Sequence, residues 1–280
     1  MNPLRPLSVP GYRPLFAAMV LTVFAQGAWA LYLAMQTLDL GATAATLSSV
    51  VAWSGIGLLA GSLPAGVLAD RVAKKSIIVG VLTVNLAAST TTSTAAIFDA
   101  ATFWMLAVSA FVIGVSTAFF FPAYTALVPV LVGSDDLMAV NGLEGTTRPL
   151  VGQTLAPGVV GAVIGASVPA AGGYLIAGAL GLALIAALRL PAPCSAETDA
   201  EAPATSALRD LLDGFGYVAR TRWVRSSVLL AAAMGLAVTG PLDVLLPALI
   251  RSTHDNGPAV YGDVLGALGV GGLVGSLVAG

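Results

Sequence analysis

Long apolar segments separated by short polar connections dominate the sequence. A helix that crosses a bilayer needs about 20 mostly apolar residues. Eight segments approach or exceed this length: 14–37, 44–69, 76–97, 102–131, 138–164, 167–189, 226–250 and 259–280. Strands of a membrane β-barrel would alternate apolar and polar residues over about 10 positions, whereas these segments are continuously apolar. The pattern therefore predicts an all-α membrane protein.

The composition agrees with a bilayer environment. Hydrophobic residues make up 57% of the chain and charged residues only 9%, against about a quarter in soluble domains. The single cysteine, Cys194, excludes an intrachain disulfide and a cysteine-based metal site. No phosphate-binding loop G-x-x-x-x-G-K-[ST] occurs, so ATP-driven pumping is not indicated. We expect no metal and no cofactor.

One connection is much longer than the others and predicts the domain organisation. Residues 190–225 contain an acidic run and a basic end, and apolar residues recur at helical spacing between Leu208 and Val218. This spacing predicts a short amphipathic helix on the membrane surface, either as a structural linker or as a regulatory site. We expect a bundle over 1–189, a cytoplasmic linker over 190–225, and the start of a second bundle over 226–280.

Lysine and arginine are unevenly distributed over the connections. With the N-terminus inside, ten of the twelve lie on the inner side, Arg251 lies outside, and Arg148 lies within a span. Cytoplasmic loops are the ones enriched in these residues. We therefore expect a multi-pass protein of the bacterial inner (plasma) membrane with a cytoplasmic N-terminus.

A ten-residue segment occurs twice. GLLAGSLPAG at 57–66 and GGLVGSLVAG at 271–280 are identical at seven of ten positions and fall on the second and eighth predicted spans. Small residues at such spacing also serve ordinary helix packing. The six-span offset is typical of transporters built from parallel six-helix repeats. It predicts a six-helix bundle followed by the first two helices of a second bundle.

The segment after the first copy, GVLADRVAKK at 66–75, resembles the signature loop of the major facilitator superfamily, G-x-x-x-D-R-x-G-R/K-R/K. Ala73 stands where the pattern has glycine. The matching positions are Gly66, Asp70, Arg71, Lys74 and Lys75. The resemblance implies a gating loop in which Asp70 accepts hydrogen bonds at a facing helix N-terminus. The simpler alternative is that the basic residues are inside anchors.

A second motif lies in the fifth span. GQTLAPGVVG at 152–161 is similar to the antiporter motif G-x-x-x-G-P-x-x-G-G: Gly152, Pro157 and Gly161 match, and two glycines are replaced. The wider run 121–165 and DVLLPALI at 243–250 resemble bacterial exporters of the enterobactin-exporter type. An ordinary proline-kinked helix is the alternative reading of the motif.

This resemblance implies a secondary transporter that exports small amphipathic, drug-like or siderophore-like molecules, by proton antiport, as in drug resistance or siderophore export. Family members continue for four further spans after the second copy, so we expect a C-terminally truncated form. Uptake of a sugar or other metabolite is the alternative within transport. An intramembrane enzyme or an inert scaffold is the alternative from another class. The expected partners are a small-molecule substrate, protons and the bilayer, and no nucleic acid.

Three charged residues lie within predicted spans. Each costs about 2.5–3.5 kcal/mol to insert near the bilayer centre. Glu144 and Arg148 are four residues apart and can pair on one helix face. They form either a structural ion pair or a pair that couples proton exchange to substrate movement. Asp243 is a third candidate for the cavity, or a hydrated residue near the outer mouth.

Two groups of residues are candidates for the substrate cavity. Gln26, Trp29 and Tyr32 recur at spacings of three along the first span, so they share a broad face. Phe120 and Tyr124 belong to an aromatic cluster in the fourth span. These aromatic rings could stack on a substrate, and Gln26 could hydrogen-bond to it. Core packing or an interfacial aromatic belt is the alternative.

Overall fold

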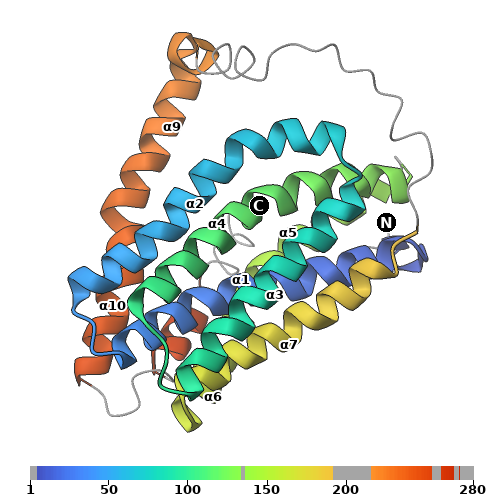
Figure 1. Ribbon diagram of the computed structural model, residues 1–280. Helices are drawn as coiled ribbons and strands as arrows, with labels where there is room; N and C mark the ends of the chain where they lie inside the picture. The colour runs from blue at the N-terminus through green and yellow to red at the C-terminus, as the bar shows by residue number, and fades with distance from the viewer. Residues whose placement is uncertain (1–4, 134–135, 192–215, 254–259, 268–270, 272–280) are drawn as a thin grey trace.

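A computed structural model shows that the chain folds into helices (Figure 1). The structure describes residues 5–133, 136–191, 216–253, 260–267 and 271. No strand occurs in these described ranges. The predicted all-α fold is therefore confirmed.

Within the described residues, six helical segments are long and apolar enough to cross a membrane. The fifth consists of three consecutive helical pieces, and the middle piece, η3 (Leu150–Leu155), is a π-helix. The elements are α1 (Tyr12–Asp39), α2 (Ala44–Arg71), α3 (Lys74–Ile97), α4 (Phe103–Leu131), α5 (Leu137–Pro149), η3 (Leu150–Leu155), α6 (Ala156–Ala166) and α7 (Pro169–Leu188). The six predicted spans agree with these bounds to within two residues at each end.

The seventh predicted span, 226–250, differs from the expectation of one uninterrupted α-helix. It is longer, and it consists of α9 (Arg222–Met234), the π-helix η5 (Gly235–Thr239) and α10 (Gly240–Thr253). Pro241 follows the π-helix, and proline cannot donate the backbone hydrogen bond that a regular α-helix would need there. The interruption therefore has a local cause in the sequence.

Two predicted elements lie mostly outside the described residues. Of the eighth span, 259–280, the structure describes 260–267 and 271, and these residues are helical. Of the linker, it describes 190–191 and 216–225. The amphipathic helix therefore stays a prediction.

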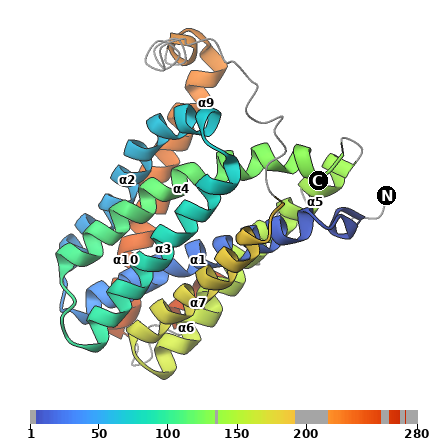
Figure 2. The same cartoon turned by 45° about the vertical axis from the view of Figure 1, so that its right-hand side comes forward.

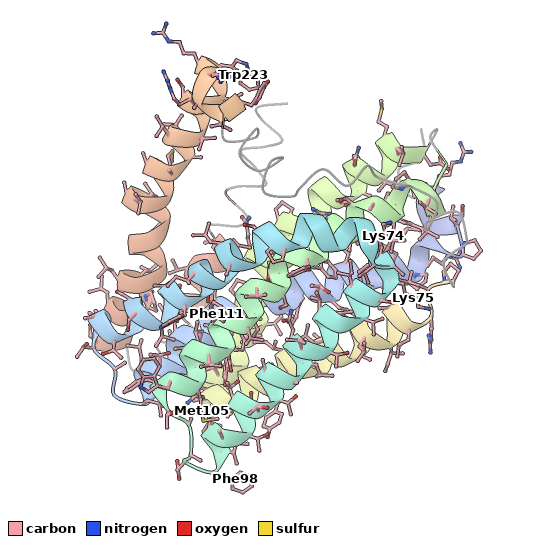
Figure 3. All side chains as sticks on the ribbon, turned by 45° about the horizontal axis from the view of Figure 1, so that its top comes forward. Lys74, Lys75, Phe98, Met105, Phe111 and Trp223 are labelled. Carbon is pink, nitrogen blue, oxygen red and sulfur yellow. The ribbon has the colours of Figure 1, made fainter. Side chains whose placement is uncertain are left out.

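Glycines allow α2 and α4 to pack with their backbones in contact. A Cβ atom at Gly57 would lie 2.1 Å from the carbonyl oxygen of Phe111, and one at Gly114 would lie 2.2 Å from that of Ser54. Figure 3 labels Phe111 where α4 passes α2. The small residues of the first repeat copy thus serve helix packing here.

Helices α1, α3, α4 and α7 pack together around the core of the bundle. α1 packs along α7, and α3 packs against both α4 and α7, as the two views of the ribbon show (Figures 1 and 2). Ser89 of α3 donates a hydrogen bond of 2.9 Å to the carbonyl oxygen of Gly173 of α7. Such bonds stabilise helix association in a bilayer, where apolar burial drives it little. α10 lies against α1 and α2.

Candidate functional site

Three polar side chains from three helical segments converge on the carboxylate of Glu144. Tyr12 of α1 and Tyr124 of α4 both donate to Glu144 Oε1, at 3.2 and 2.5 Å. Arg148, one turn further along α5, donates from Nη2 to Glu144 Oε2 at 2.7 Å. Glu144 is only 8% exposed. These four residues, which we call the Glu144 cluster, join α1, α4 and α5 at one end of the bundle.

Aromatic rings surround the guanidinium of Arg148. Its Cζ atom lies 4.8 Å from the ring centroid of Phe121 and 5.5 Å from that of Tyr124. Phe120, which is fully buried, stacks on Tyr124 with ring centroids 6.1 Å apart. Arg148 Nε is buried and has no hydrogen-bond partner among the described residues. Cation–π contact and the Glu144 carboxylate therefore hold the guanidinium in place.

The carboxylate of Glu144 lies among hydrogen-bond donors from three helices. The ionised carboxylate accepts three hydrogen bonds, and every group that faces it is a donor. A proton on Glu144 would place a further donor among them. The hydroxyl groups of Tyr12 and Tyr124 can accept a hydrogen bond as well as donate one, whereas the guanidinium of Arg148 can only donate. One carboxylate therefore fixes the packing of α1 and α4 on α5.

A second ion pair lies at the same end of the bundle. Arg5, in the 3₁₀-helix η1 (Arg5–Ser8), lies with its Nε 3.2 Å from Oδ1 of Asp136, which directly precedes α5. The Arg5 side chain is 66% exposed, so this pair contributes little stability. It does show that the start of α1 and the start of α5 lie side by side.

The structure describes part of the loop that resembles the family signature. The side chains of Asp70 and Arg71 and the surroundings of Gly66 lie outside the described residues, so the capping role of Asp70 stays a prediction. Lys75 Nζ donates to the carbonyl oxygens of Leu188 at 3.1 Å and Leu190 at 2.5 Å. Figure 3 shows Lys75 beside the end of α7. Lys75 therefore caps the C-terminal end of α7.

The motif in the fifth span lies at two close backbone approaches. A Cβ atom at Gly27 of α1 would lie 1.9 Å from the carbonyl oxygen of Gly152, so α1 touches the π-helix η3 directly. A Cβ atom at Gly262 would lie 2.7 Å from the carbonyl oxygen of Pro157 and 3.1 Å from Cα of Gly161. The matching residues of the motif thus form helix contacts on both sides of the span.

The candidate cavity residues of α1 are packed inside the bundle. Trp29 is 6% exposed and Tyr32 is fully buried, and their ring centroids are 5.3 Å apart. Gln26 and Trp29 line a cavity of about 10 Å³, which has room for about one water molecule. A substrate would reach them only after the helices move. The side chain of Asp243 lies outside the described residues.

Sequence reasoning identified the pair Glu144 and Arg148. It missed the contacts of Tyr12 and Tyr124 with Glu144 and the contact between Asn85 and Ser116. Tyr12 lies just before the predicted start of the first span, and no local spacing connects it to Glu144. Asn85 and Ser116 are buried polar residues inside apolar spans, and Ser116 Oγ donates to Asn85 Oδ1. An isolated asparagine in an apolar run is the signal that could have indicated this second contact.

The described residues contain no group of three histidine, cysteine, aspartate or glutamate side chains that could hold a metal.

A family model described as transmembrane secretion effector, of the MFS type, matches residues 1–280. The chain belongs to this family of MFS transporters. It is therefore a multi-pass membrane transporter that acts on small molecules within a lipid bilayer. A comparison with curated proteins gave no match.

Proposed function

We propose that this MFS transporter exports small amphipathic molecules across a bacterial inner membrane in exchange for protons. The observation that carries the proposal is the buried Glu144 carboxylate with donors from α1, α4 and its own helix. In this proposal the N-terminus is cytoplasmic, 1–189 form the first bundle, and 190–225 link it to a second bundle. The substrates would be drug-like or siderophore-like.

In this proposal, the helices of the bundle alternate between two packings as Glu144 gains and loses a proton. In the proposed cycle, the ionised form of Glu144 is the one that holds α1 and α4 against α5 through Tyr12 and Tyr124. With Glu144 protonated, Arg148 loses its carboxylate partner and the tyrosine contacts change. Antiport follows if substrate binds one packing and the proton favours the other. The proton gradient would then drive the substrate outward.

The family description supports export rather than uptake, and one helix contact supports coupling between the two proposed bundles. The matching family is described as a secretion effector. The antiporter-like motif also lies in direct backbone contact with helix residue Gly262 through Pro157 and Gly161. That contact joins the predicted fifth and eighth spans, one from each proposed bundle, so a kink at Pro157 can be transmitted between them.

Transport in reconstituted vesicles tests the proposal. The purified chain is placed in liposomes with an imposed pH gradient, and the movement of fluorescent amphipathic dyes is followed. We expect gradient-driven dye movement by the wild-type chain and at least a tenfold loss in Glu144→Gln. Asp99→Asn is the matched control, because Asp99 is exposed in a loop and asparagine tolerates its positive φ of 52°. Export by antiport would be contradicted if the wild-type chain moved no dye in response to the imposed pH gradient. If dye movement by Glu144→Gln depended on the pH gradient as it does in the wild type, the Glu144 cluster would have only a structural role.

A further inference from the structure

A groove between α3 and α4 is lined almost entirely by apolar side chains, and its volume is about 430 Å³. The lining residues come from 76–84 of α3 and 111–119 of α4, and Val72, in the connection between α2 and α3, lies at one end. Figure 3 labels Lys74 at the start of α3 and Phe111 on α4, toward opposite ends of this groove. No residue of the Glu144 cluster lines it, so the proposed transport mechanism does not use it.

The groove follows α3 over about the depth of one bilayer leaflet. From Lys74 to Val84 the helix rises about 15 Å, at about 1.5 Å per residue. The hydrocarbon core of a bilayer is about 30 Å thick, so one leaflet contributes about 15 Å. Val84 is 42% exposed, and Gly80 has nothing within 4 Å of its Cβ position, so the groove is accessible along its length. An extended acyl chain therefore matches it in length and in polarity.

A lysine without an assigned role lies at the end of the groove where α3 begins. Lys74 lies in the sequence between Val72 and Ser76, which both line the groove. It is half-buried and makes no hydrogen bond or ion pair with any other described residue. Its neighbour Lys75 is instead bound to the carbonyl oxygens at the end of α7. The ammonium group of Lys74 is therefore available to an anionic group at the mouth of the groove.

We propose that this groove binds one acyl chain of an anionic phospholipid, with the lipid phosphate at Lys74. Any lipid chain can fill an apolar groove, so the groove alone does not select a lipid. Lys74 supplies the selection, because a basic residue at the membrane surface attracts anionic headgroups, whereas a zwitterionic headgroup carries its own cation. In the proposed topology the connection between α2 and α3 is cytoplasmic, so the lipid belongs to the inner leaflet.

Lipid retention by the purified full chain tests the headgroup preference. The chain in detergent micelles is titrated with phosphatidylglycerol or phosphatidylcholine of identical acyl chains, and bound lipid is counted by native mass spectrometry. We expect the wild type to retain phosphatidylglycerol at least threefold better than phosphatidylcholine, and Lys74→Gln to lose this preference. Arg189→Gln is the matched control, because Arg189 is an exposed basic residue at the end of α7 and does not line the groove. A preference that survives Lys74→Gln, or that Arg189→Gln removes equally, would overturn the proposal.

Two glycines supply a matched test of the acyl-chain site. Gly80 of α3 and Gly178 of α7 are both exposed helical residues with nothing within 4 Å of their Cβ positions, and only Gly80 lines the groove. Leucine at either position is compatible with the helix, but Gly80→Leu places a side chain in the groove.

Phosphatidylglycerol with a photoactivatable acyl chain should label the segments 76–84 and 111–119 of the wild-type chain in liposomes. We expect Gly80→Leu to reduce this labelling at least threefold and Gly178→Leu to leave it unchanged. Undiminished labelling in Gly80→Leu would contradict the acyl-chain site. Displacement of the lipid by the fluorescent dyes of the transport assay would show that the groove is a substrate path, and this result would also overturn the proposal.

Discussion

The two tyrosines of the Glu144 cluster provide the sharpest test of its energetics. Tyr12 and Tyr124 donate to the same oxygen of Glu144, at 3.2 and 2.5 Å. Replacing either with phenylalanine removes one hydroxyl group and keeps the ring. In Tyr124→Phe the stacking on Phe120 and the contact with Arg148 remain available. Any difference between the two variants therefore reports the two hydrogen bonds.

The distances set the expected magnitudes. Neutral hydrogen bonds between membrane helices contribute about 0.6 kcal/mol on average, whereas a hydrogen bond to a charged group contributes about 1.5–3 kcal/mol. The bond from Tyr124 is short and its acceptor is charged, so we expect Tyr124→Phe to lower the free energy of unfolding by about 2 kcal/mol. The bond from Tyr12 is longer than the usual O–H···O range. Because this length weakens the bond despite its charged acceptor, we expect Tyr12→Phe to cost only about 0.6 kcal/mol, the average between membrane helices.

Equilibrium unfolding in mixed micelles measures these differences, provided that unfolding is reversible. The control is a double-mutant cycle with Glu144→Gln, which removes the charge that both hydroxyl groups face. In the Glu144→Gln background the cost of Tyr124→Phe should fall below about 1 kcal/mol. The reasoning is refuted if Tyr12→Phe is as destabilising as Tyr124→Phe, or if the two changes at Tyr124 and Glu144 are additive.

Two further predictions concern helix contacts. Gly27→Ala places a Cβ atom 1.9 Å from the carbonyl oxygen of Gly152, so α1 and η3 must separate and the protein should lose about 1–3 kcal/mol of stability. The control is Gly145→Ala, which has nothing within 4 Å of its Cβ position and should not be destabilising in the same unfolding assay. Equal costs for the two variants would contradict the close approach. Lys75→Met removes the donor to the carbonyl oxygens of Leu188 and Leu190, so backbone amides in the last turn of α7 should exchange at least threefold faster with deuterium, and unchanged exchange would show that the cap is dispensable.

The positions of the first six membrane spans could be predicted because an apolar run of bilayer length has few other uses. The pairing of Glu144 with Arg148 could also be predicted, since residues four apart on a helix lie on the same face. Both features depend on neighbours in sequence. Local periodicity is sufficient for such features.

The rest of the Glu144 cluster depends on how separate helices pack. Tyr12 is 132 residues from Glu144 in the sequence, and no spacing rule connects them. The π-helices η3 and η5 were also missed, because a single wider turn leaves almost no trace in the apolar pattern. Prolines near both segments were visible, but proline predicts a disturbance of the helix without specifying its form.

The composition of the cluster bears on whether Glu144 is a structural or a coupling residue. An ion pair that serves only to carry a carboxylate into the bilayer would be complete within α5, because Arg148 already neutralises Glu144. The cluster adds hydroxyl donors from α1 and α4, which are separate helices. In the proposed mechanism, these donors would make the positions of two other helices depend on the protonation of Glu144. An ion pair that only allows a carboxylate to lie in the bilayer does not need contacts with other helices. A residue that couples a proton to helix movement does need them.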